Sequence, residues 1–223
     1  MNQAATLSTL AGKSAAHSAG VRACVLGRGM APALSDPALE VVGRLHPERA
    51  ALERFIAGCF FRGYGAVITH FADTLLGVRN SDGQWAAGLG YSLPGARPVF
   101  IEQYLDVPLE SALGSVLGER VARAAVAEVG NMASTSAGLG RLLIALATQH
   151  FYAQGLDYVV FTATRALANS FVRLGIPIFP VAVADPARLH DGVGNWGNYY
   201  RNSPTVMVGR IASGLHTVVE DAA

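Results

Sequence analysis

Carboxylates placed within or beside apolar segments are the residues of this sequence best suited to chemistry. Glu128 interrupts the apolar run 124–129, and burial there would raise the pKa of its carboxyl toward the range of a general base. The same side chain could instead face solvent where strands separate, or pair with Arg123 or Arg141. Catalysis or substrate binding by Glu128 and these structural roles therefore stay open as alternatives.

Glu102 and Asp106 are the second pair of candidate acid–base residues. Their segment, 99–106, has a strand-like pattern, and residues four apart on a strand share a face. Together they could bind an ammonium group, one carboxylate holding it and the other accepting its proton. Asp106 is equally well explained as the N-cap of a helix entered through Pro108. Glu102 has no comparable local task, so it is the first choice for amine recognition or for the base.

A run of small residues from Thr135 to Arg141 could bind phosphate. It joins a strand-like stretch to an amphipathic helical stretch. A Gly-rich turn that opens a helix leaves backbone N–H groups unpaired at the positive end of the helix dipole. The turn residues predicted to contact phosphate are Ser136, Gly138, Leu139, Gly140 and Arg141.

Aromatic and hydroxyl side chains supply further candidates. Trp196, Tyr199 and Tyr200 lie on a Gly- and Asn-rich loop that could cover a pocket, with a Tyr as a general acid, or that the aromatics could merely pin to the sheet. Thr162 and Thr164 end a predicted strand, where their hydroxyls could contact substrate or cap the next helix. For Thr164 the cap is the preferred interpretation.

Alternating strands and helices must position these residues. The sequence predicts an amphipathic helix that starts near 46–48, has its apolar face at 52–60 and ends at Gly63, and further helices over 109–117, 138–154 and 165–174. Strand patterns occupy 39–45, 74–78, 85–91, 99–106, 124–129, 158–162, 178–183 and 205–211, with a hairpin turn at 80–83. Residues 1–37 are rich in Ala, Ser and Gly and are expected to form a mostly irregular arm, whereas 38–223 are expected to form a single domain.

Composition excludes several classes of protein. The chain has 223 residues, 51% of them hydrophobic, and a net charge of +1, so no basic surface indicates nucleic acid binding. No apolar stretch is long enough to span a membrane, which leaves membrane contact at most peripheral. The start of the chain lacks a secretory pattern, so a cytoplasmic location is expected. Neither the Cys nor the His residues have metal-like spacing, so no metal is expected.

The order of elements and the Gly-x-Gly turn resemble the GNAT fold of N-acyltransferases. That resemblance implies an α/β (α+β) architecture, a mixed and mostly antiparallel central sheet flanked by helices. In that family the turn reads Arg/Gln-x-x-Gly-x-Gly/Ala and holds the pyrophosphate of coenzyme A. Gly138 and Gly140 match its glycines, while Thr135 takes the Arg/Gln position. Phe171 takes the position of the Tyr that often protonates the leaving thiolate, and Thr164 that of an Asn.

Acyl-homoserine lactone synthases share this fold, depart from the ordinary acetyltransferase pattern and draw acyl groups from acyl carrier protein. The resemblance therefore implies a phosphopantetheine-borne acyl thioester as co-substrate, carried on acyl carrier protein or on coenzyme A. It places the pantetheine arm beside the central strand, whose backbone N–H groups would stabilise the oxyanion. Asn131 could equally shape a β-bulge. The residues so implied are Asn131, Met132, Ala133, Ser134, Thr162 and Asn169.

Four motifs resemble those of the thermostable haemolysin family, in order and with matching spacing from about residue 40 to 214. They are Ile101–Asp106, Glu128–Ser134, Phe161–Thr164 and Trp196–Tyr200.

The leading hypothesis is an N-acyltransferase that moves an acyl group from the thioester to an amine of a small acceptor. Two alternatives remain: a membrane-active haemolysin, or a GNAT-like module that binds an acyl ligand or carrier without catalysis. The residues expected to contact substrate are Tyr104, Thr164, Trp196, Tyr199 and Tyr200.

Overall fold

The structure, a computed structural model, describes residues 38–95, 97–190 and 194–220. The predicted arm, 1–37, lies outside the described residues. No described helix is both long and apolar enough to cross a membrane.

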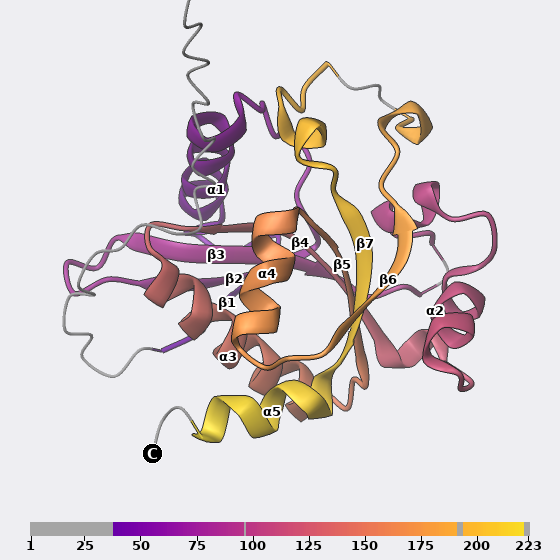
Figure 1. The fold of residues 1–223 in the computed structure, drawn as a ribbon. Helices are drawn as coiled ribbons and strands as arrows, with labels where there is room; N and C mark the ends of the chain where they lie inside the picture. The colour runs from indigo at the N-terminus through magenta and orange to yellow at the C-terminus, as the bar shows by residue number, and fades with distance from the viewer. Residues whose placement is uncertain (1–37, 96, 191–193, 221–223) are drawn as a thin grey trace, which may run out of the picture.

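The described strands form a seven-stranded sheet in the order β1-β2-β3-β4-β5-β7-β6 (Figure 1). Only β4 and β5 lie parallel, and every other neighbouring pair is antiparallel. The prediction of a mixed, mostly antiparallel sheet is therefore confirmed. The strands are β1 (Glu40–Val42), β2 (Thr74–Arg79), β3 (Trp85–Ser92), β4 (Val126–Ser134), β5 (Tyr158–Ala163), β6 (Ile178–Val183) and β7 (Thr205–Arg210).

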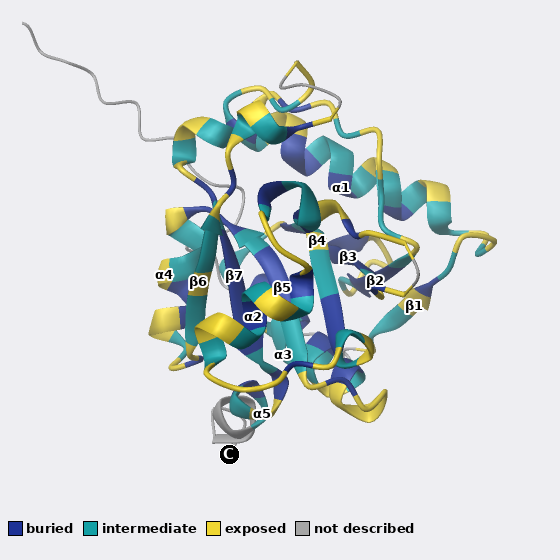
Figure 2. Ribbon diagram, turned by 90° about the vertical axis from the view of Figure 1, so that its right-hand side faces the viewer, coloured by how far each residue is buried: buried dark blue, intermediate teal, exposed yellow. Residues whose placement is uncertain are grey.

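Helices cover both faces of the sheet. One face packs against α1 (Arg49–Tyr64) and α2 (Leu109–Leu117), and the other against α3 (Ala137–Ala153), α4 (Arg165–Arg173) and α5 (Ile211–Glu220). Short 3-10 helices occupy the connections: η1 (Phe100–Tyr104), η2 (Arg123–Ala125), η3 (Pro186–Arg188) and η4 (Tyr199–Asn202). Figure 2 shows β2, β3 and β7 mostly buried, β4 and β5 partly so, and the edge strand β6 intermediate to exposed.

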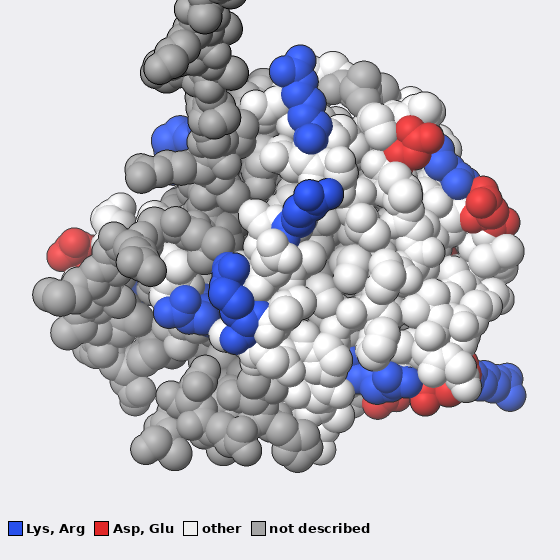
Figure 3. Space-filling model, viewed as in Figure 1, with Lys and Arg blue, Asp and Glu red and all other residues white. Residues whose placement is uncertain are grey.

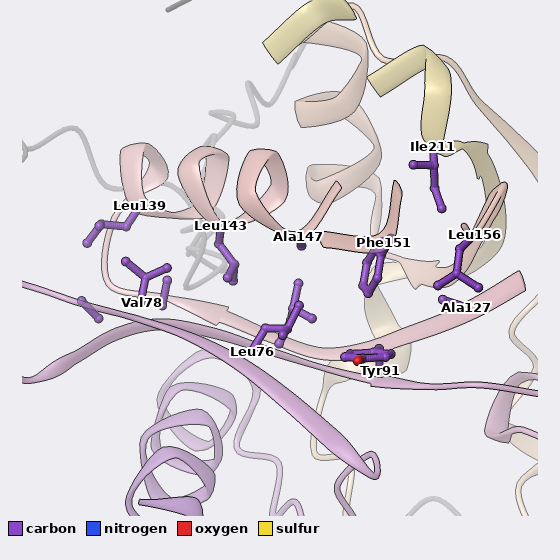
Figure 4. Close-up of a cluster of buried hydrophobic side chains, with 13 residues drawn as sticks. Leu76, Val78, Tyr91, Ala127, Leu139, Leu143, Ala147, Phe151, Leu156 and Ile211 are labelled. Atoms are coloured by element: carbon purple, nitrogen blue, oxygen red, sulfur yellow. The ribbon is translucent and has the colours of Figure 1, made fainter. Parts of the chain in front are cut away.

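The long helix α3 forms because its apolar residues recur every fourth position and so line one side. That side packs on β2 and β3, the cluster drawn in Figure 4. Burial of these apolar side chains stabilises this half of the fold. The stripe consists of Leu139, Leu143, Ala147 and Phe151, and faces Leu76, Val78 and Tyr91.

β4 and β5 share a hydrogen-bonded ladder only from Val126 to Val129, opposite Tyr158 to Phe161. Beyond this point β4 continues beside β3, whereas β5 continues beside β7. In Figure 1, β2 and β3 accordingly run across the view while β6 and β7 run down it. The two parallel strands therefore diverge at their carboxyl ends.

A β-bulge in β4 accompanies the divergence. Gly88 pairs with Ala133 and Gly90 with Gly130, so two residues of β4 oppose one of β3. Asn131 adopts φ +53° at the bulge, which confirms the bulge interpretation of this residue. The extra residue reverses which face the following side chains occupy: Val129 packs beside α3, and Ala133 packs with the core of α1.

The prediction of a strand over 99–106 is wrong, because Phe100–Tyr104 is the 3-10 helix η1. In the sheet β4 lies between β3 and β5, so it has no free edge at which 99–106 could add as a further strand. The N–H groups of Val99, Phe100 and Ile101 donate instead to the carboxylates of Glu102 and Glu128. Side-chain acceptors thus replace the strand partner that the segment lacks.

The chain end also differs from the prediction. The last strand stops at Arg210, and Ile211 begins α5, where its side chain is buried and its N–H donates to the Asp157 carbonyl. In α5 the apolar residues recur at helical spacing. The strand predicted over 205–211 ended before this pattern, so the sequence analysis did not predict the helix.

The loop before η4 is fastened to the end of α1. Asn198 N–H donates to the Tyr64 carbonyl at 2.9 Å, and Val67 N–H donates to the Asn195 carbonyl at 2.7 Å. Between them Gly197 has φ +54°, and a Cβ there would lie 2.1 Å from the Tyr64 carbonyl oxygen. Only glycine fits this close approach of two backbones.

Gly197→Ala should lower the free energy of unfolding by about 2 kcal/mol or more, because the backbone contact would have to break at an unfavourable φ. Chemical denaturation measures this loss. Gly194→Ala is the matched control, since a Cβ at Gly194 meets no atom within 4 Å. Equal stability of the two variants would contradict the fastening of this loop.

Candidate active site

A cavity of about 550 Å³ opens where β4 and β5 diverge. Its wall includes the last part of β4, from Glu128 to Met132, and the end of β5. From Gly130 onward, β4 has no strand on its β5 side. The cavity brings together eight of the residues predicted from the sequence: Tyr104, Glu128, Asn131, Met132, Thr162, Thr164, Trp196 and Tyr199.

The cavity has an apolar end and a polar end. The apolar end lies between α3, α4 and β5, and is lined by Ile144, Phe151, Val159, Phe161, Leu167 and Phe171. Phe171 packs against Phe161 in a tilted arrangement, with 5.0 Å between ring centroids. The other end, here called the polar end, has a mixed wall: His70, Asp73, Ser92, Arg97, Gln103 and Glu128 line it together with apolar residues such as Ile68, Phe71, Leu93 and Phe100. One end therefore suits a hydrocarbon chain and the other a polar or charged group.

Two carboxylates line this cavity, Asp73 and Glu128, and Glu128 is the one on β4 beside the strand divergence. Its Oε1 accepts the N–H of Ile101 at 2.6 Å, and its Oε2 accepts the N–H of Phe100 at 3.1 Å. Desolvation raises the pKa of this carboxyl to about 7, while the two backbone hydrogen bonds oppose the rise and the charge of Glu102 adds to it. A carboxylate with that pKa can accept and release a proton near neutral pH.

Glu128 does not pair with either arginine considered for it. Arg123 pairs with Glu102 and also, at 3.0 Å, with Glu110. Arg141 is exposed and has no ion pair among the described residues. Among the described residues the carboxylate of Glu128 therefore has no cationic partner that would oppose the rise in pKa caused by burial.

Glu102 has the local structural task that the sequence did not reveal. Its carboxylate pairs with Arg123 and accepts the Val99 N–H at 3.1 Å. Arg123 in turn donates to the Gly95 carbonyl at 3.3 Å. Glu102 lies outside the residues that line the cavity, so it holds η1 in place rather than facing the space where a substrate would sit.

Asp106 lies apart from the cavity. Its side chain is 87% exposed and pairs with Arg188 at 2.8 Å. The N-cap of α2 is Pro108, so the cap interpretation of Asp106 is wrong. The expectation that Asp106 and Glu102 share a strand face is also wrong, because η1 replaces the strand.

The aromatic loop is both pinned and adjacent to the cavity. Trp196 and Tyr199 line it, and Tyr199 packs edge-on against Tyr64 with centroids 5.2 Å apart. Tyr200 does not line it, but its hydroxyl lies 2.5 Å from that of Tyr104, which does. Desolvation raises the pKa of both Tyr104 and Tyr200, so these hydroxyls stay protonated near neutral pH.

The turn predicted to bind phosphate closes α3 tightly onto β4. Ser136 is the N-cap and accepts the Leu139 N–H at 3.3 Å. A Cβ on Gly140 would lie 3.0 Å from Ser134 Oγ, so glycine permits the close packing of helix on strand. Thr164 likewise accepts the Leu167 N–H as the N-cap of α4, which confirms its cap interpretation. Ala133, Ser134, the turn residues and Asn169 do not line the main cavity.

Arg97, His70 and Asp73 were missed by the sequence analysis. They lie in loops without periodicity, and no motif marked them. The loop that carries His70 and Asp73 is hydrogen-bonded to the Asn131 side chain of β4, whereas Arg97 lies in the segment before η1, so only the tertiary structure brings them to one cavity. The described residues contain no cluster of three or more His, Cys, Asp or Glu that could hold a metal ion.

A profile of the family described as "Thermostable hemolysin" matches residues 42–215. A search of curated proteins found no match.

Solved structures similar to this chain include several acyl-transferring synthases. One is BjaI, described as a CoA-dependent acyl-homoserine lactone synthase with SAM and isopentyl-CoA: TM-score 0.57, 14% identity, 83% of this chain and 89% of that chain. The acyl-homoserine lactone synthase LasI gives TM-score 0.55 at 10% identity, over 78% and 90%. FeeM, an N-acyl amino acid synthase from uncultured soil microbes, gives 0.52 at 15%, over 79% and 92%. These similarities confirm the predicted GNAT-like fold.

The raised pKa of Glu128 should make stability depend on pH. The folded carboxyl, with a pKa of about 7, binds its proton more tightly than the unfolded one near 4.5. Its contribution is therefore fully present below about pH 4.5 and is lost as the pH rises through about 7. Thermal melting of wild type against Glu128→Gln should show the wild type losing stability relative to the variant across this window. Parallel melting curves would show that Glu128 is not desolvated.

Proposed function

We propose that this chain, which belongs to the thermostable haemolysin family, is an N-acyltransferase that moves an acyl group from a phosphopantetheine thioester to an amine. The observation that carries the proposal is the cavity itself, which joins an apolar end to a polar end that contains Glu128. Similar structures support the same class, since they are named as acyl-homoserine lactone and N-acyl amino acid synthases. The donor is acyl carrier protein or acyl-coenzyme A, and the acceptor a small amine.

The acyl chain occupies the apolar end beside Phe151, Phe161 and Phe171. The thioester carbonyl then lies at the strand divergence, beside backbone of β4 that has no ladder partner on β5. N–H groups of Gly130 to Met132 on that side would hold the oxygen as negative charge develops. Asn131 shapes the bulge that presents this backbone, rather than supplying a reacting side chain.

Glu128 acts as the base. The amine nitrogen attacks the thioester carbon, its proton passes to the Glu128 carboxylate, the C–N bond forms and the C–S bond breaks. A thiol has a pKa near 8.5, so the sulfur can leave as a thiolate without a strong acid beside it. Phe171 in the usual Tyr position is therefore compatible with turnover.

Glu102 is assigned as a positioning residue that holds η1 and hence the backbone partners of Glu128. A role for Asp106 in acceptor recognition stays a prediction.

Incubation of the protein with acyl carrier protein donors, acyl-coenzyme A and a panel of amines should yield new N-acyl products by mass spectrometry. Thioester binding without any product would favour the non-catalytic module instead. Permeabilisation of liposomes by the protein with no acyl donor present would favour the membrane-active alternative.

Glu128→Gln should lower kcat by about 100-fold or more, the usual scale for loss of a general base. In wild type, kcat/KM should rise with pH up to about 7, where the carboxyl ionises, and then level off. Glu102→Gln is the comparison, because it changes a carboxylate of the same η1 region that lies outside the cavity. It should lower stability and activity together, through loss of the Arg123 pair. Loss of kcat in Glu102→Gln at unchanged stability, with Glu128→Gln active, would instead make Glu102 the base.

A further inference from the structure

A second cavity of about 470 Å³ opens where β5 ends and β7 begins. Residues of α4 and residues at the end of η4 form its walls, and Tyr64 and Thr164 line both this cavity and the main one. The two cavities are therefore neighbours that meet at the last residue before α4. The other residues that line it are Arg165, Ala166, Asn169, Arg201, Asn202 and Ser203.

The lining of this cavity is cationic. Arg165 and Arg201 both line it, and no carboxylate does. Neither guanidinium forms an ion pair within the described part of the chain, whereas Arg123, Arg188 and Arg210 all do. Figure 3 shows cationic side chains over the α4 side of the molecule, with the acidic ones toward the edges of the view. Two guanidinium groups with amide and hydroxyl donors beside them suit a doubly charged anion such as a phosphate ester.

The position of the second cavity beside the main one indicates which kind of phosphate ester it could bind. A thioester held with its acyl chain at the apolar end has its carrier arm leading out of the main cavity, and Thr164 lies on the boundary with the second cavity. The Ser136–Arg141 turn lines neither cavity. A chain-like ligand leaving past Thr164 therefore reaches Arg165 and Arg201 directly.

We propose that the cavity between α4 and η4, the second cavity, binds the phosphate of the donor's phosphopantetheine arm. The inference rests on the proposed function, because it takes the acyl thioester to lie in the main cavity. Acyl carrier protein and coenzyme A both carry this phosphate, so the site recognises the chemistry common to the two donors. Arg165 and Arg201 clamp the phosphate oxygens, and Asn169 and Ser203 offer further hydrogen bonds.

The test compares two donors that differ only in the phosphate: an acyl-phosphopantetheine and the corresponding acyl-pantetheine. In the double variant Arg165→Gln/Arg201→Gln, KM for the first should rise by at least about tenfold, since one lost charge-assisted contact alone has that scale, with kcat little changed. KM for acyl-pantetheine should stay as in wild type. Arg173→Gln is the matched control, since Arg173 lies at the far end of α4 and lines neither cavity. It should leave both donors unaffected.

Several outcomes would overturn the proposal. Equal losses with both donors would mean that the arginines act on structure rather than on phosphate. An unchanged KM for acyl-phosphopantetheine, or a phosphate-dependent loss in Arg141→Gln alone, would place the phosphate elsewhere, in the latter case at the start of α3. Holo-acyl carrier protein and coenzyme A, used as further donors, should both lose affinity in the double variant. A loss restricted to coenzyme A would assign the cavity to a phosphate of its nucleotide instead.

Direct binding separates this inference from the proposed function. Titration calorimetry of wild type with phosphopantetheine and with pantetheine should show tighter binding of the phosphorylated ligand, an advantage lost in the double variant. Phosphate-dependent binding without any acyl transfer would retain the site and refute the transferase. Acyl transfer without phosphate-dependent binding at these arginines would do the reverse.

Discussion

The backbone ladder between β4 and β5 ends after Val129 and Phe161, and most of what this structure can do depends on that separation. Parallel strands within a sheet normally satisfy each other's N–H and C=O groups along their length. Here each strand turns to an antiparallel neighbour instead, β4 to β3 and β5 to β7. The space between them becomes the cavity, and the backbone that faces it is free to meet a ligand. The bulge at Asn131 belongs to the same arrangement, because it lets β4 bend away without losing its pairing with β3.

A second constraint fixes the polar end of that cavity. Between the sheet and α2, the segment around η1 has no strand partner, so its N–H groups are satisfied by carboxylates. Two glutamates share this task under opposite electrostatic conditions. Glu102 is paired with Arg123, whereas Glu128 has only backbone donors and the nearby charge of Glu102. Burial therefore raises the pKa of Glu128, and the same contacts that hold η1 create a group able to exchange protons near neutral pH.

The two cavities together describe a path of changing polarity. Aromatic and aliphatic side chains of α3, α4 and β5 line one part of the main cavity. The carboxylate of Glu128 and the β4 backbone that has no β5 partner lie at the strand divergence. The guanidinium groups of Arg165 and Arg201 line the second cavity, beyond Thr164. An acyl chain, a thioester and a phosphate occur in this order along a phosphopantetheine donor. Proteins named as acyl-homoserine lactone and N-acyl amino acid synthases share this fold. The thermostable haemolysin name, by contrast, describes an effect on membranes rather than a chemistry.

The sequence by itself determined the periodic elements, the mixed sheet and the family, because side-chain spacing reports which faces are buried and motifs survive in order along the chain. The α3 stripe, the α4 cap at Thr164 and the candidacy of Glu128 all follow from local pattern. Tertiary structure alone decided between the carboxylates. Which of Glu102 and Glu128 lines the cavity depends on η1 forming in place of a strand, and on Arg123 reaching Glu102 from a separate segment. The meeting of Arg165 and Arg201 is likewise invisible along the chain, since packing of α4 against the approach to β7, and not spacing, brings them to one cavity.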